Sequence, residues 1–282
     1  MDMVNRLRRV FPSLPWLAPA LIILLIVYLL PLAKVLTISV MEPVVGFGNY
    51  EKLLLDAGMR HIFWTTFRIS GITTVVSVAL GYVVALAMVN APRRRFQLML
   101  VCVLIPFWIS VLVRAFAWIV LLRSGGVINS ALLSLGIIKE PLDLLYNDFG
   151  VVVGMVHYMV PLAVLTIYGQ MSGIDTRLAM AARGLGARPL YAFARIFLPL
   201  SVPGISAAAI LIFITALGFY IVPAMLGGGK TLMLAEYVSL MINATVDWGM
   251  GTAMASTLAV LVLMLMFLLS RIVNLRRVFG GA

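Results

Sequence analysis

Six stretches of the chain carry almost no charged side chains and are long enough to cross a lipid bilayer. A helix needs about 20 mostly apolar residues to do so, and it satisfies its own backbone hydrogen bonds in lipid. The pattern therefore predicts an all-α polytopic membrane protein with six transmembrane helices in a single domain, 16–273. The expected spans are 16–36, 69–91, 97–122, 149–171, 200–223 and 250–272.

The composition excludes a soluble globular protein. Hydrophobic residues make up 63% of the 282 residues and charged residues only 11%, whereas a soluble domain carries about 25% charged residues. The formal net charge is +11, but a nucleic-acid-binding protein gathers its Lys and Arg on one face. Here the basic residues stand in short groups between apolar runs. Lipid is therefore an expected partner, and nucleic acid is not.

These basic groups stand before the first predicted span, between the second and third, between the fourth and fifth, and after the sixth. All of them therefore lie on the same side of the membrane. Cytoplasmic flanks of membrane helices carry an excess of Lys and Arg, so both terminal segments, 1–15 and 274–282, are expected in the cytoplasm. The first apolar run is too long for a cleaved signal peptide and is interpreted as a retained anchor. The groups assigned to the cytoplasm are Arg6, Arg8 and Arg9; Arg93, Arg94 and Arg95; Arg177, Arg183, Arg188 and Arg195; and Arg271, Arg276 and Arg277.

The loop between the fourth and fifth predicted spans has the pattern of two short helices. Asp175 is suited to cap the N-terminus of the first helix, and Gly184 or Gly186 is suited to end it in a left-handed conformation. Pro189 suits the first turn of the second helix, which is expected to end at Pro199 and lead into the fifth span.

An apolar ridge is expected on the first of these short helices, within the segment 175–195. On physical grounds two interpretations stay open: the ridge is a knob for the groove of a partner, or it lies on lipid headgroups. The ridge residues, which follow helical spacing, are Leu178, Ala181, Ala182 and Leu185.

The spacing in this loop resembles the cytoplasmic EAA signature of the membrane subunits of binding-protein-dependent ABC importers. In that family the loop is the coupling helix that docks in a cleft of the ATPase subunit. The resemblance implies a coupling role here, with an apolar or water-exposed contact where the signature has its Glu. The matching positions are Met180 (in place of that Glu), Ala181, Ala182, Gly186, Ile196, Leu198 and Pro199.

A second resemblance is clearest in the stretch that starts at Pro106, and the similarity covers nearly the whole chain. The sequence is similar to the first permease subunit of polyamine (spermidine/putrescine) and opine importers, which implies the type I importer (MetI-like) fold in a bacterial inner membrane. It also implies three partners: an ABC ATPase dimer that carries ATP and Mg²⁺, a second related permease subunit, and an extracytoplasmic solute-binding protein. A polyamine is the expected solute. An opine, an amino acid derivative or an aminophosphonate is the alternative.

Four residues are candidates for the translocation pathway: Arg114, Trp108, Tyr158 and Tyr220. An ionisable residue such as Arg114 inside a predicted span marks a functional site by default. It lies roughly 25 Å from the cytoplasmic end, at 1.5 Å per residue, so it can snorkel outward, pair structurally, or line the outer vestibule or gate. The three aromatic residues can stack against an amine, although membrane aromatics more often pack or anchor helices.

No catalytic, cofactor-binding or metal-binding residue is expected. His61 and His157 have no second ligand at metal spacing, and the single cysteine, Cys102, lies in an apolar stretch. The glycines of Gly227–Thr231 lack the spacing and the preceding strand of a phosphate-binding loop, and are expected to form a turn. An ion-driven secondary carrier or a membrane enzyme would be expected to carry buried acids or convergent titratable groups. No Asp or Glu lies inside the predicted spans.

Overall fold

The computed structural model describes residues 19–20, 22–175 and 177–272, and within them it contains helices and no strand. Six stretches are long and apolar enough to cross a membrane, which confirms the predicted fold class. The terminal segments 1–15 and 274–282, with Arg6, Arg8, Arg9, Arg276 and Arg277, lie outside the described residues. The six candidate spans are Ile22–Met41, Ala57–Val89, Val111–Ser134, Asp148–Met171, Pro189–Leu217 and Trp248–Leu268.

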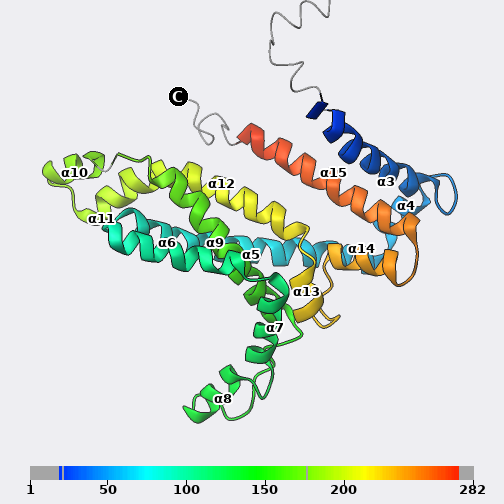
Figure 1. Ribbon diagram of the computed structural model, residues 1–282, viewed down its shortest axis with the longest axis horizontal. Helices are drawn as coiled ribbons and strands as arrows, with labels where there is room; N and C mark the ends of the chain where they lie inside the picture. The colour runs from blue at the N-terminus through cyan, green and yellow to red at the C-terminus, as the bar shows by residue number, and fades with distance from the viewer. Residues whose placement is uncertain (1–18, 21, 176, 273–282) are drawn as a thin grey trace, which may run out of the picture. The chain divides into compact units, whose positions relative to one another are not determined.

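The helices belong to two compact units, which are described separately (Figure 1). One unit contains the described chain up to Asp56 together with Val238–Val260, and the other contains Ala57–Tyr237 and the chain from Leu261. The elements are η1 (Leu25–Leu29, a π-helix), α3 (Leu30–Met41), α4 (Gly48–Leu55), α5 (Ala57–Val89), α6 (Arg93–Trp108), α7 (Val111–Leu122), α8 (Val127–Ser134), α9 (Asp148–Met171), α10 (Arg177–Gly184), α11 (Pro189–Ala192), η2 (Phe193–Phe197, a π-helix), α12 (Leu198–Leu217), α13 (Ile221–Leu226), α14 (Leu234–Asn243) and α15 (Trp248–Ile272).

Helix α9 is the centre of the larger unit, where it packs against α5 and α12. The closest approach to α5 is at Gly81, where an added Cβ atom would lie 2.5 Å from the Cβ atom of Ala163. Only a glycine fits there without a shift of one helix. Along its buried face α9 places a fully enclosed apolar side chain at every fourth position: Val151, Met155, Met159, Ala163, Ile167 and Met171.

Two of the expected continuous helices are broken. The third, expected over 97–122, ends at Trp108 and resumes at Val111, because Ile109 and Ser110 both have extended ψ angles. The fifth, expected over 200–223, ends at Leu217 and resumes as α13 after a turn at 218–220. Figure 1 shows that α7 turns away from the line of α6 at its break.

In the smaller unit, hydrogen bonds tie α3 to α4. The amide of Asn49 donates to the backbone oxygens of Ser39 (3.2 Å) and Glu42 (2.7 Å). The hydroxyl groups of Ser39 and Tyr50 lie 2.8 Å apart. An added Cβ atom on Gly249, near the start of α15, would lie 2.3 Å from the Glu42 carbonyl oxygen. The α3–α4 turn and the start of α15 therefore pack in direct contact.

Candidate functional site

The segment between the fourth and fifth spans contains the predicted short helix, α10. The Asp175 carboxylate accepts a hydrogen bond from the backbone N–H of Arg177 (2.9 Å), which confirms the predicted cap. At the other end Gly186 has a φ of +89°, a conformation that glycine adopts without steric cost. Backbone bonds from Gly186 to Arg183 and from Ala187 to Ala182 then close the helix. Of the two candidate glycines, Gly186 is therefore the left-handed one.

The apolar side chains of α10, and of Leu185 directly after it, face outward from the unit. Leu178 is 49% exposed, Met180 59% and Leu185 91%. Ala181 is exposed and Ala182 half-buried. Among the described side chains of α10 none is buried, so the predicted ridge has no partner surface within this unit.

The chain continues from this helix into the membrane domain through one unbroken helical run, Pro189–Leu217. Phe197 is buried and Ile196 and Leu198 are half-buried, whereas Pro199 is exposed. The expectation that a short helix ends at Pro199 is wrong, because this proline lies in the first turn of α12. A proline in the first turn of a helix loses no essential hydrogen bond. The π-helical turn η2 connects α11 directly to α12, so the helical run continues across this proline.

The base of α12 is fixed to two other membrane helices. An added Cβ atom on Gly204 would lie 2.8 Å from the Cβ atom of Gln170 on α9, so the two backbones are close. The hydroxyl groups of Ser201 and Tyr82, on α5, lie 3.2 Å apart. The base of α12, which follows α10 in the chain, therefore packs directly against α5 and α9.

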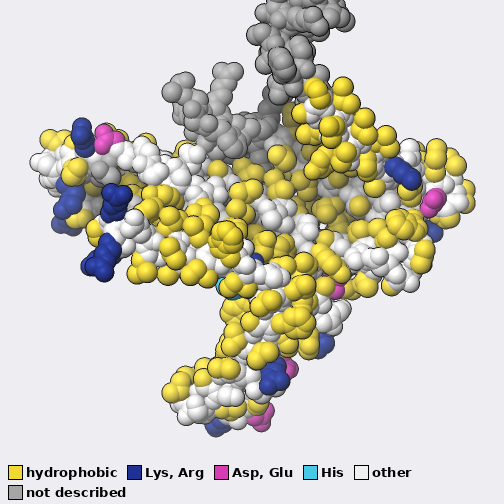
Figure 2. Space-filling view, viewed as in Figure 1, with side chains coloured by type: hydrophobic (Ala, Val, Ile, Leu, Met, Phe, Trp, Pro, Cys, Tyr) yellow, Lys and Arg dark blue, Asp and Glu magenta, His cyan; other side chains and the backbone are white. Residues whose placement is uncertain are grey.

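The same end of this unit carries exposed arginines, which are visible in dark blue near α10 in Figure 2. A row of guanidinium groups suits the level of anionic lipid headgroups on the cytoplasmic side. The exposed residues at this end are Arg93, Arg94, Arg95, Arg177, Arg183, Arg188 and Arg195.

Within the membrane-spanning part, the structure brings two of the four pathway candidates together. The guanidinium carbon of Arg114 lies 4.6 Å from the centroid of the Tyr158 ring. The other two candidates lie at the helix breaks: Trp108 ends α6 and is 89% exposed, and Tyr220 precedes α13 and is 44% exposed. His157 accepts a hydrogen bond at Nδ1 from the Trp118 indole N–H (3.0 Å), so it has a structural partner, as predicted.

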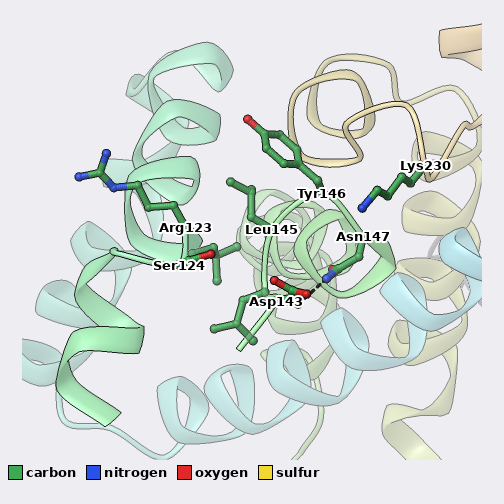
Figure 3. Close-up of a pocket in the computed structure, with 9 residues that line it drawn as sticks. Arg123, Ser124, Asp143, Leu145, Tyr146, Asn147 and Lys230 are labelled. Carbon is green, nitrogen blue, oxygen red and sulfur yellow. Dashed lines mark hydrogen bonds between the residues drawn. The ribbon is translucent and has the colours of Figure 1, made fainter. Parts of the chain in front are cut away.

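At the opposite end from α10, a cavity of about 410 Å³ opens between the end of α7, the loop before α9 and Lys230 (Figure 3). It is lined by three ionic side chains, Arg123, Asp143 and Lys230. Tyr146, also in its wall, has a φ of +61°, which costs a non-glycine residue about 1–3 kcal/mol. Gly228 packs closely against this ring, since a Cβ atom added to Gly228 would lie 2.6 Å from the Cδ1 atom of Tyr146. Such strain is characteristic of binding sites.

A cluster around Asp148, next to this cavity, was not predicted. The Asp148 carboxylate forms an ion pair with Arg68 on α5 and accepts a hydrogen bond from the Thr231 hydroxyl (2.6 Å). The Leu234 backbone N–H donates to the Thr66 hydroxyl (2.8 Å). We call these contacts the outer clasp. They join α5 and α9 to the turn that was predicted at Gly227–Thr231. In this turn Gly228 and Gly229 have positive φ angles.

A buried carboxyl group lies just beyond the outer clasp. Glu236, in the first turn of α14, is nearly enclosed, and its Oε2 atom has no hydrogen-bond partner among the described residues. Burial raises the pKa of Glu236, and a hydrogen bond from the Met233 backbone offsets part of that rise.

These features define a polytopic α-helical membrane protein with an exposed short helix at one end of its larger unit. The chain belongs to the family of binding-protein-dependent transport system inner membrane components, whose profile matches residues 77–278. The predicted family is thereby confirmed, and so is the multi-pass inner-membrane location.

Individual relatives show which members of this family the chain resembles. The chain is 32% identical to the spermidine/putrescine transport system permease protein PotB of Haemophilus influenzae, over 79% of this chain and 78% of the relative. It is 30% identical to PotB of Escherichia coli, over 84% and 86%. Its fold matches one chain in the crystal structure of a bacterial alginate ABC transporter in complex with an alginate pentasaccharide-bound periplasmic protein. That match has a TM-score of 0.82 over the full length of both chains at 17% identity.

Proposed function

We propose that this chain is the membrane-spanning subunit of an ATP-driven importer and forms the pathway for a polyamine such as spermidine or putrescine. The observation that carries the proposal is the similarity to PotB proteins over about four-fifths of the chain. The subunit itself hydrolyses nothing. ATP and Mg²⁺ bind to a partner ATPase dimer, and a second related permease completes the pathway.

The exposed ridge of α10 is the surface on which the ATPase docks. Its apolar side chains match a hydrophobic groove, and the continuous helical run to Leu217 carries the movement into the membrane. The coupling residues are those of the signature, from Met180 to Pro199. Closure of the ATPase dimer shifts the subunit between states that bind its partners with different affinities.

The binding protein docks at the other end, over the cavity in Figure 3. Arg123 and Lys230 line this cavity and disfavour a polycationic solute there, but they suit carboxylate side chains on a protein surface. The outer clasp, one residue away from Lys230, connects a docked protein to α5 and α9.

Reconstitution of the native complex tests this function. A C-terminal tag on the full chain should recover an ATPase subunit and a related permease from gently solubilised membranes. In proteoliposomes with the associated binding protein, labelled spermidine should accumulate only when ATP is supplied. Uptake driven by an ion gradient without ATP would identify a secondary carrier instead. ATP-driven uptake of an opine or an aminophosphonate, but not of a polyamine, would change the substrate class.

A further inference from the structure

Two helix breaks in the larger unit meet at one side chain of α9, Tyr158. The first break separates α6 from α7 and the second separates α12 from α13, and α13 packs against both α7 and α9. Tyr158 contacts Arg114 on α7 on one side and the Phe219 ring, in the second break, on the other, with ring centroids 4.7 Å apart. From the outer end of α9 at Asp148 to Tyr158 is about 15 Å at 1.5 Å per residue. The breaks therefore converge in the outer half of the membrane.

Among the residues that the structure describes, no carboxylate forms an ion pair with Arg114. Apart from Asp148 at the end of α9, none of the ten acidic residues of the chain lies within a candidate span. The Arg114 Nε atom is buried and has no hydrogen-bond partner among the described residues. The face of the Tyr158 ring, 4.6 Å from the guanidinium carbon, is therefore a principal attractive contact for this charge. A ring face attracts a cation through its quadrupole, with a larger effect where water is excluded.

The break after α12 adds negative potential at this level. The last carbonyl groups of a helix have no partner within the helix, and its C-terminus carries about half a negative charge. Helix α12 ends at Leu217, two residues before Phe219, whose ring contacts Tyr158. Broken membrane helices with such ends coordinate cations in other transport proteins. Aromatic faces and helix carbonyls together are the chemistry that holds an organic ammonium ion without a carboxylate.

We propose that the Tyr158 ring and the carbonyl end of α12 form a site for an ammonium group of the translocated solute, which Arg114 fills as a tethered cation in this conformation. This inference rests on the proposed function as a polyamine importer and specifies where its substrate binds. An arriving ammonium group displaces the guanidinium, which returns when the solute leaves. The exchange keeps the site occupied by one positive charge, and a carboxylate that would trap a polycation is not needed.

Binding of labelled spermidine to the purified complex, in nanodiscs of zwitterionic lipid, tests the site without any need for transport. Tyr158→Leu removes the ring face and should weaken binding about three- to thirty-fold, the range of one cation–π contact. Tyr158→Phe keeps the face and should restore affinity to near that of the unmodified complex. Arg114→Gln removes the competing cation and should tighten binding several-fold, while Arg114→Lys should not. Phe116→Leu, on an exposed side chain of the same α7, is the matched control.

The outcomes separate the site from the proposed function. Equal losses in Tyr158→Leu and Tyr158→Phe, or weaker binding in Arg114→Gln, would overturn the site and leave Arg114 a structural residue. The expected binding pattern in a complex that fails to accumulate spermidine would support the site and refute the importer assignment. ATP-driven uptake whose KM does not change in either the Tyr158→Leu or the Arg114→Gln variant would retain the importer and refute the site.

Discussion

At the scale of single residues, the enclosed carboxyl group of Glu236 gives the protein a pH dependence. Its pKa is raised by burial, so the folded protein binds this proton more tightly than the unfolded chain does. Stability from this group is therefore fully present below the ordinary value of 4.5 and is lost as the pH rises through the raised pKa.

Glu236→Gln should remove the loss of stability that occurs as the pH rises. We expect the thermal midpoint of the purified complex to be higher in the variant at pH 8, by about 2–4 °C for each kcal/mol, and the difference to vanish below pH 4.5. Glu51→Gln, which changes an exposed acid in the first turn of α4, is the control and should follow the unmodified protein at every pH. Parallel midpoints for Glu236→Gln and the unmodified protein would show that the carboxylate is not desolvated.

Residue-level contacts were also the hardest to foresee from the sequence. Arg114 and Tyr158 were each singled out by type, since a charge and an aromatic ring in a span are informative alone, but nothing in the spacing pairs them. The partners in the outer clasp, Arg68 and Asp148, are 80 positions apart. Such pairs depend on how helices pack, and packing is decided by the whole set of side chains.

At the scale of elements, the short helix α10 depends on one glycine for its termination. Gly186→Ala leaves room for the new Cβ atom but places it at a φ of +89°, which costs about 1–2 kcal/mol for an L-residue. We expect the end of α10 to fray, and the solute imported per ATP hydrolysed by the reconstituted complex to fall severalfold.

Gly184→Ala is the matched control, because Gly184 lies within the same helix, has no positive φ and has open space around it. It should leave the ratio unchanged or slightly improved, since Ala favours helix. A second variant, Ala181→Glu with Ala182→Glu, places charge on the docking ridge and should lower the same ratio. If the Gly186→Ala and Gly184→Ala variants behave alike, the left-handed end has no part in coupling.

The spans themselves could be predicted because length and apolarity are local properties. The breaks could not, and the prolines show why. Pro106 lies just before the break after Trp108, yet Pro161 and Pro203 lie inside helices that continue. Proline weakens a helix at one point, but neighbouring helices decide whether the weak point opens. The position of α10 could be predicted from the Asp175 cap, the two glycines and the apolar spacing between them, since all three are local in sequence.

At the scale of the whole molecule, the orientation predicted from the basic clusters has a direct test. The chain has a single cysteine, Cys102, so Cys102→Ser gives a background free of thiols. In that background a membrane-impermeant maleimide should label Lys139→Cys on intact cells or spheroplasts. It should label Arg188→Cys only in inverted vesicles, because the two exposed positions flank opposite ends of α9. Labelling in the reverse sense would show that the subunit has the opposite orientation in the membrane, with α10 on the side away from the ATPase.

The outer clasp also has a consequence for biogenesis. Thr66 and Arg68 leave the ribosome well before their partners: Asp148 follows Arg68 by 80 residues, and Leu234 follows Thr66 by 168. At 5–20 residues per second, the last of these bonds forms roughly ten to thirty seconds after its first half has been made. The outer end of α5 therefore enters the membrane before Arg68 has its carboxylate partner, and the last of these bonds forms only when the fifth span has been inserted. A chain whose synthesis stops before residue 231 lacks the Thr231 hydroxyl that donates to Asp148 and the Leu234 N–H that donates to Thr66, so its outer clasp is reduced to the ion pair between Arg68 and Asp148.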